Sequence, residues 1–405
     1  GPFPITVKGY IKAEGNEDSK ILFSASNPNI TWDGLDYEGA NILSSEPSVY
    51  NQCIFQYGRA QSGEEYNSGG AIAVRDYNDL EFYNCTFRHN MADLPAVSFA
   101  TNAGAIGLWN ASPIIQKCIF YDNYALHYAG AILAYLGSSP VISNCLFFNN
   151  ESERGGALAY YENSNGILIN NTIADNYATY GGGLYFYMQS NPEIINTILW
   201  GNEADAGHQV YSSTNSSSNP GFYYCDIEEG QAGFGGSQIN GGYFSNLEED
   251  PLFTDDPEST LYTVDAASPC IDAGTPDTSA WYYPQYLPET CLCGNPRKSG
   301  TNIDMGAYEY VILGIEDPQA IDHSLHIYPN PVQGEATIKL KAQNKSVIRV
   351  ELYNSIGKKV ETILDGTVQA GDQTINFQTM HLKTGMYFCR IQAGNKAVTK
   401  KIIKL

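Results

Sequence analysis

Positive charge is scarce in this sequence, and that scarcity limits the partners the protein can have. The 405 residues include 22 Lys and Arg against 44 Asp and Glu, which gives a formal net charge of −22 at pH 7. A surface with this excess of acid repels the phosphate backbone that nucleic-acid-binding proteins contact through Lys and Arg. We therefore expect no nucleic-acid partner.

Long apolar runs are missing as well. No stretch approaches the roughly 18 to 20 apolar residues that a membrane-spanning helix needs. The first residues, Gly1-Pro2-Phe3-Pro4, are neither an initiator methionine nor a secretory signal. Hydrophobic residues nevertheless make up 43% of the chain, which is ample for a buried core. We expect a soluble, folded chain that has been trimmed at its N-terminus.

The charge is unevenly distributed along the chain. Residues 322–405 hold 12 Lys and Arg and 6 Asp and Glu, whereas residues 1–321 hold 10 and 38. A change of sign at one boundary indicates two domains with different roles. We place the boundary in residues 311–322, an apolar run that is broken by Pro318 and is typical of a linker.

A repeat runs from about residue 50 to residue 227, with a step that settles at 26 residues. Each repeat has a pair of small residues before an aliphatic run, and the second members of the pairs are Gly70, Gly104, Gly130, Gly156 and Gly182. An apolar residue followed three positions later by Asn recurs with the same step, at Phe87/Asn90, Phe120/Asn123, Phe147/Asn150, Ile173/Asn176 and Leu199/Asn202. Three short apolar runs per repeat, separated by Gly, Pro, Ser and Asn, indicate three short strands.

Three strands per repeat form one coil of a solenoid, in which successive coils stack at the spacing of paired strands, about 4.8 Å. We therefore predict parallel β-helix coils over residues 1–227 and a closing region and cap over 228–310. The Asn column is expected to be structural, because Asn tolerates left-handed corners and stacked amides can hydrogen-bond. A column of Cys residues is expected to pack in the core rather than bind metal: Cys53, Cys85, Cys118 and Cys145.

These motifs resemble the repeats of secreted, pectate-lyase-like right-handed β-helix proteins and of the polymorphic outer-membrane adhesin family. The segments 250–253, 268–274 and 303–309 resemble the closing region of surface-anchored β-helix proteins. The resemblance implies an all-β chain with a right-handed parallel β-helix solenoid, but it says little about activity.

The closing region holds three cysteines outside the column. In an exported protein we expect a disulfide from Cys270 to either Cys291 or Cys293, and with 9 cysteines at least one stays unpaired within the chain. The acidic residues near position 255 match no calcium loop, so we expect no metal and no other cofactor.

Residues 323–405 alternate apolar and polar positions between Gly and Asn turns, which predicts a small Ig-like β-sandwich. Its most specific residues are Tyr328, Pro329, Asn330, Pro331, Gly357, Gly385, Tyr387, Lys400, Lys401 and Lys404. In this order they resemble the C-terminal sorting domain of type IX secretion cargo. The resemblance implies that the secretion machinery of the outer membrane is a partner and that the body is secreted or attached to the outer cell surface. It also implies cleavage within residues 311–322.

Alternation along the strand after each small-residue pair predicts one outward column, made of Arg75, Trp109, Tyr135, Tyr161 and Tyr187. Exposed rings one coil apart could bind an extended glycan, since sugars pack their apolar face on aromatic rings. The same rings could instead stack on each other and stabilise the sheet. We hypothesise an adhesin-like body that binds polysaccharide or another cell surface.

The alternative is a polysaccharide lyase or glycoside hydrolase acting in a groove of the β-helix. A hydrolase needs two positioned carboxylates, for which Asp122 and Asp175 are candidates two repeats apart. A lyase needs a base beside positive charge. The nearest candidate cluster is Arg88, His89, Glu151, Glu153 and Arg154, whereas His127 and His208 are isolated in the sequence. No lyase motif is recognisable, so the sequence favours binding without deciding the question of catalysis.

Overall fold

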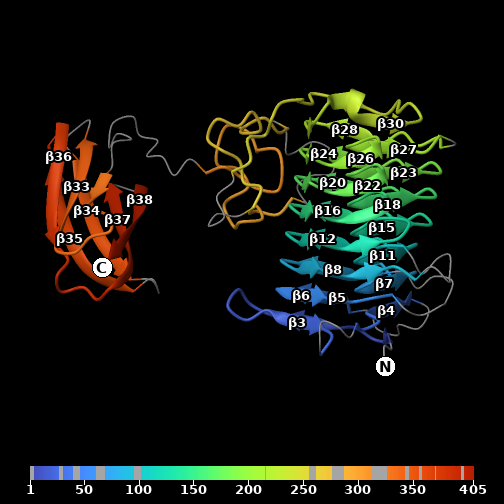
Figure 1. The fold of residues 1–405 in the computed structure, drawn as a ribbon, viewed down its shortest axis with the longest axis horizontal. Helices are drawn as coiled ribbons and strands as arrows, with labels where there is room; N and C mark the ends of the chain where they lie inside the picture. Colours follow the sequence, from blue (N-terminus) through green and yellow to red (C-terminus); the bar gives the residue numbers. More distant parts are fainter. Residues whose placement is uncertain are drawn as a thin grey trace. The chain divides into compact units, whose positions relative to one another are not determined.

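The chain folds into two units, residues 1–310 and 311–405, and nearly all of the regular secondary structure that is described consists of β-strands (Figure 1). The computed structural model describes residues 4–26, 31–39, 46–60, 69–94, 102–214, 216–254, 261–275, 287–311, 326–342, 346–354, 358–369, 371–393 and 396–405. Within these ranges one 3-10 helix occurs, η2 (Gly230–Gly233). No helix in the described parts of the chain is long and apolar enough to cross a membrane.

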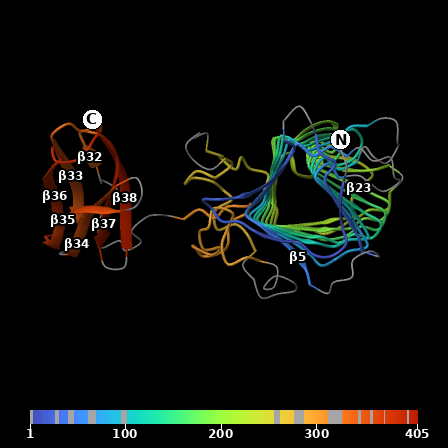
Figure 2. The same ribbon diagram turned by 90° about the horizontal axis from the view of Figure 1, so that it is seen from below.

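Three long sheets wind around the axis of the first unit, which Figure 2 shows end-on. Sheet 1 contains β1 (Ile5–Val7), β4 (Leu35–Glu38), β7 (Ile72–Arg75), β11 (Ile106–Trp109), β15 (Ile132–Tyr135), β19 (Leu158–Tyr161), β23 (Leu184–Tyr187), β27 (Val210–Ser212) and β30 (Phe234–Gly236). Sheet 2 contains β2 (Lys12–Glu14), β5 (Ser48–Asn51), β8 (Leu80–Tyr83), β12 (Ile114–Gln116), β16 (Val141–Ser143), β20 (Ile167–Ile169), β24 (Glu193–Ile195), β28 (Gly221–Tyr223) and β31 (Tyr243–Phe244).

Sheet 3 contains β3 (Ile21–Ser24), β6 (Cys53–Gln56), β9 (Thr86–Arg88), β13 (Ile119–Tyr121), β17 (Leu146–Phe148), β21 (Thr172–Ala174), β25 (Ile198–Trp200) and β29 (Asp226–Ile227). A fourth, shorter sheet, sheet 4, contains β10 (Met91–Ala92), β14 (Tyr124–Ala125), β18 (Glu151–Arg154), β22 (Tyr177–Tyr180) and β26 (Glu203–Ala206). All neighbours in the four sheets are parallel, and the predicted solenoid with three main strands per coil is confirmed. Sheet 4 was not predicted, because its strands do not form apolar runs, as β18 (ESER) and β26 (EADA) show.

The register between coils keeps each repeat position in one column. Ile106 of β11, for example, pairs with Ile72 of β7 on one side and with Ile132 of β15 on the other. Because every coil repeats this register, one type of side chain can stack along the whole solenoid. Such columns form both the core and the surface of this unit.

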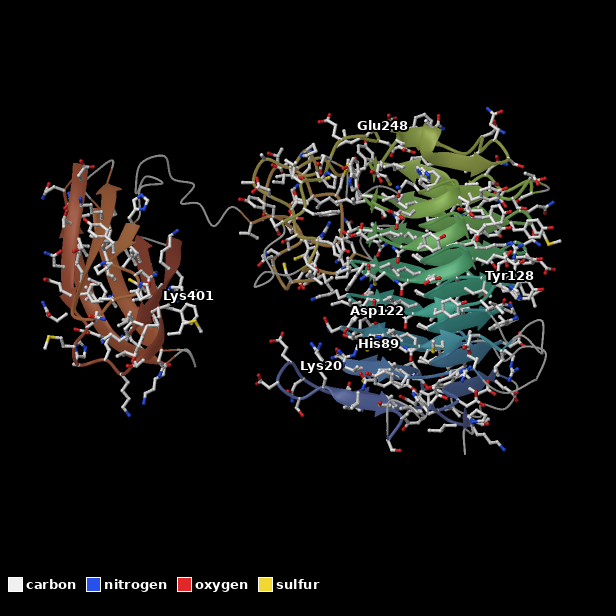
Figure 3. All side chains as sticks on the ribbon, in the orientation of Figure 1. Lys20, His89, Asp122, Tyr128, Glu248 and Lys401 are labelled. Carbon is white, nitrogen blue, oxygen red and sulfur yellow. The ribbon has the colours of Figure 1, made fainter. Side chains whose placement is uncertain are left out.

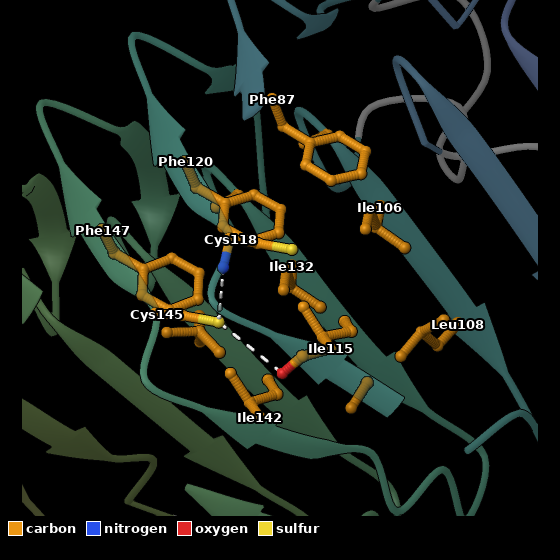
Figure 4. Close-up of a cluster of buried hydrophobic side chains, with 14 of the residues drawn as sticks. Phe87, Ile106, Leu108, Ile115, Cys118, Phe120, Ile132, Ile142, Cys145 and Phe147 are labelled. Carbon is orange, nitrogen blue, oxygen red and sulfur yellow. Dashed lines mark hydrogen bonds between the residues drawn. The ribbon is translucent and has the colours of Figure 1, made fainter. Parts of the chain in front are cut away.

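The interior holds a column of stacked rings (Figure 4). Phe55, Phe87, Phe120 and Phe147 are fully buried, with neighbouring ring centroids 4.7–4.8 Å apart and ring planes within 3–7° of parallel. The Cys column lies beside them, and the buried thiol of Cys118 donates to the carbonyl oxygen of Gln116 at 3.3 Å. Burial raises the pKa of the Cys118 thiol well above its ordinary value. The predicted core role of this column is confirmed.

The Asn column lies at the corner between sheets 3 and 4 and is buried. Each Nδ2 donates to the Oδ1 of the next amide at 2.9–3.0 Å, along Asn90, Asn123, Asn150, Asn176 and Asn202. These bonds satisfy polar groups that burial would otherwise penalise, so the column is structural as predicted.

The closing region adds one more coil and then lies along the flank of the solenoid (Figure 1). It is fastened there by hydrogen bonds to the corner between sheets 2 and 3. Asn144 Nδ2 donates to the Thr290 carbonyl at 3.1 Å, and Asn170 Nδ2 donates to the Asp304 carbonyl at 2.9 Å. The closing region thus packs on the outer surface of several coils and is hydrogen-bonded to them.

The expected disulfide from Cys270 is wrong. All nine cysteines are free, and the buried Cys270 thiol donates to Asp226 Oδ2 at 3.0 Å. Burial raises the pKa of Asp226 to about 6. Cys270 packs in a small apolar cluster with Ile198 and Met305.

The second unit is a β-sandwich of two antiparallel sheets around its own apolar core, as predicted. One sheet contains β32 (His326–Tyr328), β33 (Glu335–Ala342) and β36 (Gly371–Gln378). The other contains β35 (Lys359–Val368), β34 (Ser346–Asn354), β37 (Gly385–Ala393) and β38 (Lys396–Lys404).

The residues that carry the resemblance to a sorting domain fall into two groups: residues that are buried or hydrogen-bonded to the backbone, and exposed residues. Asn330 accepts from the Ile403 backbone at 2.8 Å and donates to the Lys401 carbonyl at 2.9 Å, so the segment 328–331 is bound to the last strand. Tyr387 is buried and donates to the Lys383 carbonyl at 2.9 Å, and Lys404 is also buried. Tyr328, Pro329, Pro331, Gly385, Lys400 and Lys401 are exposed, and Gly357 lies outside the described residues.

Candidate functional site

The strand register aligns the five residues of the predicted outward column on sheet 1. Arg75 pairs with Trp109, which pairs with Tyr135, and the column continues through Tyr161 to Tyr187. The three tyrosines are half-buried. The column is therefore present, but its members differ in how far they are accessible.

Arg75 and Trp109 do not form an exposed ladder with the tyrosines. Arg75 Nη2 is 3.0 Å from Asp36 and is paired with Glu38 as well, so its charge is compensated within the first coils. Trp109 is only 3% exposed, and its ring meets that of Tyr135 edge-on at 90°. These two residues support the column rather than extend its accessible surface.

A second column runs beside the first, along the end of sheet 4. Backbone bridges align Asn102 with Tyr128 and Tyr128 with Arg154, and strand pairing aligns Arg154 with Tyr180. In the sequence each of these residues stands directly before a small-residue pair, as in Tyr128 before Ala129-Gly130. The sequence analysis missed this column, although its constant position in the repeat was a usable signal.

The small-residue pair explains why the two columns face each other. The first residue of the pair has positive φ, at 54° in Ala129 and 74° in Gly155, so the chain turns sharply between sheet 4 and sheet 1. The second residue has no room for a side chain: a Cβ on Gly130 would lie 2.2 Å from the Gly156 carbonyl oxygen. The corner between the columns therefore carries nothing larger than the methyl groups of Ala103 and Ala129, and it leaves space in front of it.

A cavity of 460 Å³ occupies the space between the columns, a volume typical of small-molecule sites. Its lining residues are Asn102, His127, Tyr128, Leu133, Tyr135, Glu153, Arg154 and Tyr161. Tyr135 and Tyr161 come from the predicted column, whereas Trp109, Arg75 and Tyr187 do not line the cavity.

Three charged or titratable side chains meet at one side of the cavity. Glu153 Oε2 lies 3.0 Å from His127 Nδ1 and 2.9 Å from Arg154 Nη1. The Arg154 guanidinium lies over the Tyr128 ring at 5.2 Å, a cation–π contact. The view of His127 as isolated is wrong: it stands one repeat before Glu153, so the register brings them together.

The tyrosines of the cavity are hydrogen-bond donors rather than bases. Burial, and then the neighbouring tyrosines, raise the pKa of Tyr161, and burial raises the pKa of Tyr128. Both phenols stay protonated at neutral pH. Asn102 is only 6% exposed, and its Oδ1 has no hydrogen-bond partner among the described residues.

The other predicted catalytic residues lie elsewhere. Figure 3 labels Tyr128 on one flank of the solenoid and His89 and Asp122 on another. His89 Nδ1 is 3.7 Å from Asp122, and Asp175 accepts from Tyr262 at 2.8 Å. Glu153 is the only carboxylate among the residues that line the cavity.

The predicted cluster of Arg88 and His89 with Arg154 is wrong. Arg88 is on β9 of sheet 3, where it donates to Gln56 and Tyr121, whereas Arg154 ends β18 of sheet 4. Glu151 begins β18 and is exposed outside the cavity. His208 lies 3.2 Å from Glu229 and does not line the cavity either.

Comparisons with known proteins agree with the architecture. A family model described as "Right handed beta helix region" matches residues 15–165 and 104–250, and one described as "Secretion system C-terminal sorting domain" matches residues 326–405. Searches of curated proteins and of solved structures returned no match. The sorting domain marks the chain as type IX secretion cargo, recognised by that machinery and exported across the outer membrane to a secreted or surface-attached location. The chain thus belongs to the right-handed β-helix family and carries a secretion-system C-terminal sorting domain.

Proposed function

We propose that the β-helix body binds a neutral polysaccharide in the cavity between the two columns once the protein has been exported. The observation that carries the proposal is the lining itself, which combines the rings of Tyr128, Tyr135 and Tyr161 with the polar groups of Asn102 and Arg154. Aromatic walls with a few convergent polar groups are typical of sugar-sized binding sites.

The orientation of the rings supports this proposal. Tyr135 and Tyr161 meet at 72° with centroids 5.0 Å apart, and Tyr128 and Tyr161 meet at 79° with centroids 5.4 Å apart. Rings that meet at such angles leave part of their faces uncovered. A sugar can place its C–H face on one ring while its hydroxyls reach Glu153, Arg154 and Asn102.

Charge favours a neutral ligand over a polyanion. Arg154 is the only Lys or Arg among the lining residues, and it is already paired with Glu153. Residues 1–321 carry 38 acidic against 10 basic side chains, so a polyanionic chain would meet repulsion on approach. A neutral chain meets none.

The test is to measure affinity of the full chain for a panel of neutral and acidic polysaccharides while assaying the same samples for new reducing ends. A Tyr135→Ala/Tyr161→Ala variant should lose binding by tenfold or more, about 1.4 kcal/mol or more. Tyr177→Ala is the matched control, since Tyr177 is an exposed tyrosine on β22 that does not line the cavity. Absence of binding to every polysaccharide would contradict the proposal.

A uronate lyase is a second candidate, favoured by the contact of His127 with Glu153 beside Arg154. Arg154 could neutralise a uronate carboxylate while His127 takes the proton from the adjacent carbon, and the bond to the leaving oxygen then breaks. The product would hold a conjugated double bond that absorbs ultraviolet light. Such absorbance with an acidic polysaccharide, lost in His127→Ala, would make the protein an enzyme.

In this proposal the second unit directs export and the first unit binds the polysaccharide. Cleavage within residues 311–322 would separate them. The mass of the mature protein from the exporting cell tests this: a chain that ends between these residues is expected, and a mature chain that still includes residue 405 would contradict it.

A further inference from the structure

The closing region contains a tight turn at residues 290–296 that brings two cysteines together. Cys291 N donates to the Asn295 carbonyl at 2.8 Å, and Gly294 N donates back to the Cys291 carbonyl at 3.0 Å. Thr290 and Pro296 form an antiparallel bridge below them. Gly294 has φ of +88°, which its lack of a Cβ allows.

This turn places the sulfur atoms of Cys291 and Cys293 only 2.9 Å apart. Cys291 is buried and Cys293 is exposed. The hydrogen bond from Cys293 lowers the pKa of Cys291 to about 5, and the same bond raises the pKa of Cys293. A lowered pKa favours the thiolate of Cys291, and a thiolate is the reactive form in disulfide exchange.

We propose that Cys291 and Cys293 form a disulfide in the exported protein. The oxidant is an external protein disulfide, of the kind that oxidising compartments provide. A proton shift across the sulfur–sulfur contact frees the exposed Cys293 as thiolate, which attacks one sulfur of that disulfide. Cys291 then attacks the mixed disulfide, so the new bond joins the two cysteines and the oxidant leaves as a dithiol with two electrons and two protons.

The other cysteines are less accessible to an external oxidant. Cys270 is engaged with Asp226, and Cys53, Cys85, Cys118, Cys145, Cys225 and Cys389 are buried in the two cores. Cys118 and Cys145 of neighbouring coils also interact, but both thiols are buried in the core of the β-helix. Cys293 is the only exposed cysteine, so an external oxidant reaches this pair first.

The disulfide would hold the turn that fastens the closing region to the coils. Thr290 accepts from Lys117 Nζ at 2.8 Å and from Asn144 Nδ2 at 3.1 Å, while Leu292 N donates to the Ala307 carbonyl at 3.0 Å. A bridge between residues 291 and 293 would keep this turn in the shape that makes those contacts.

The test is peptide mass analysis of the full-length or mature exported protein, alkylated under denaturing conditions without reductant. Cleavage after glutamate releases residues 290–309, in which Cys291 and Cys293 are the only cysteines. We expect this peptide without alkyl groups and lighter by two hydrogens, about 2 Da. Two alkyl groups on the peptide, or a cross-link to the peptide that contains Cys270, would overturn the proposal.

Two variants give the control. Cys293→Ser changes an exposed side chain and should leave a single alkylated thiol at Cys291, whereas Cys270→Ser should leave the bridge intact. Loss of the bridge in a folded Cys270→Ser protein, or its persistence in Cys293→Ser, would count against the assignment.

Discussion

Two aromatic columns of the solenoid share the same repeat and differ in how their rings meet. Inside, Phe87 and Phe120 stack with planes 3° apart at 4.7 Å. Outside, Trp109 and Tyr135 meet at 90°, and Tyr135 and Tyr161 at 72°. The repeat alone therefore does not determine how the rings of a column meet.

The physical reason is confinement. Inside the coil each ring has neighbours on all sides, and the rings of the Phe column fit by stacking at the strand spacing. On the outer face the tyrosines lie beside a corner that carries nothing larger than a methyl group, and edge-to-face contacts are favourable for isolated aromatic pairs. The outer tyrosines thus line the cavity, and the inner phenylalanines fill the core of the solenoid.

The largest effect is expected for the inner column. Phe120→Ala removes a fully buried ring and leaves a cavity, which should lower the free energy of unfolding by about 3–5 kcal/mol. Tyr161→Ala, on the outer column, should cost far less. Denaturant unfolding of the two variants measures the difference, and equal losses would mean that the outer column is packing as well.

A smaller loss is expected in the Asn column. Asn150→Ala leaves the Asn123 amide without its acceptor and removes donors to backbone carbonyls, which should cost about 1–3 kcal/mol for each buried group left unpaired. The matched control is Asn165→Ala, since Asn165 is an Asn of a neighbouring turn outside this column. A change at Asn150 that unfolding experiments cannot tell from the control would contradict the structural role of the column.

Next in size is the effect of Arg154 on the outer site. Arg154→Met keeps the apolar stem but removes the cation over Tyr128 and the partner of Glu153, so affinity for a bound glycan should fall about tenfold, or about 1.4 kcal/mol. Arg154→Lys keeps the positive charge and should therefore retain part of the affinity that Arg154→Met loses. Calorimetric titration gives both values, and full affinity in Arg154→Met would remove this residue from the site.

The last effect depends on pH and concerns a buried carboxyl of the closing region. Burial raises the pKa of Glu309 from 4.5 to about 7, so the folded state holds this proton more tightly than the unfolded state. Its contribution to stability is present below pH 4.5 and is lost as pH rises through 7.

In the Glu309→Gln variant the side chain cannot ionise, so the variant should not lose stability from this group as the pH rises. The stability of the wild type relative to the variant is expected to fall as the pH rises from 4.5 to 8. Thermal or denaturant unfolding across this range measures it. A relative stability that rises with pH would show that the folded state holds Glu309 as a carboxylate.

The solenoid could be predicted from the sequence because the same residue types recur along the chain with a step of about 26 residues. Spacings such as Phe120 to Phe147 fix the register directly, and the buried Phe, Cys and Asn columns lie where that register puts them. The antiparallel sandwich followed in the same way from alternation along its strands.

The site was predicted only in part, because it depends on side-chain packing across a corner. Tyr135 and Tyr161 were found from alternation, but their partners across the corner were not. Tyr128 forms only an isolated bridge, and Arg154 ends the polar strand β18, so alternation of apolar and polar residues gives neither side chain a direction. The contact of His127 with Glu153 joins two coils and is visible only once the coil length is applied to turn residues. The burial of Trp109 likewise depends on which neighbours cover it.

Glycan binding at the outer tyrosines is tested most directly by titrating one neutral polysaccharide that binds the full chain into the wild type, Tyr135→Ala/Tyr161→Ala and Tyr177→Ala, each confirmed as folded. We predict equal affinity for the wild type and Tyr177→Ala, a loss of at least about tenfold for the double variant, and no new reducing ends in any sample. Unchanged affinity in the folded double variant would contradict the account and leave the outer tyrosines as packing.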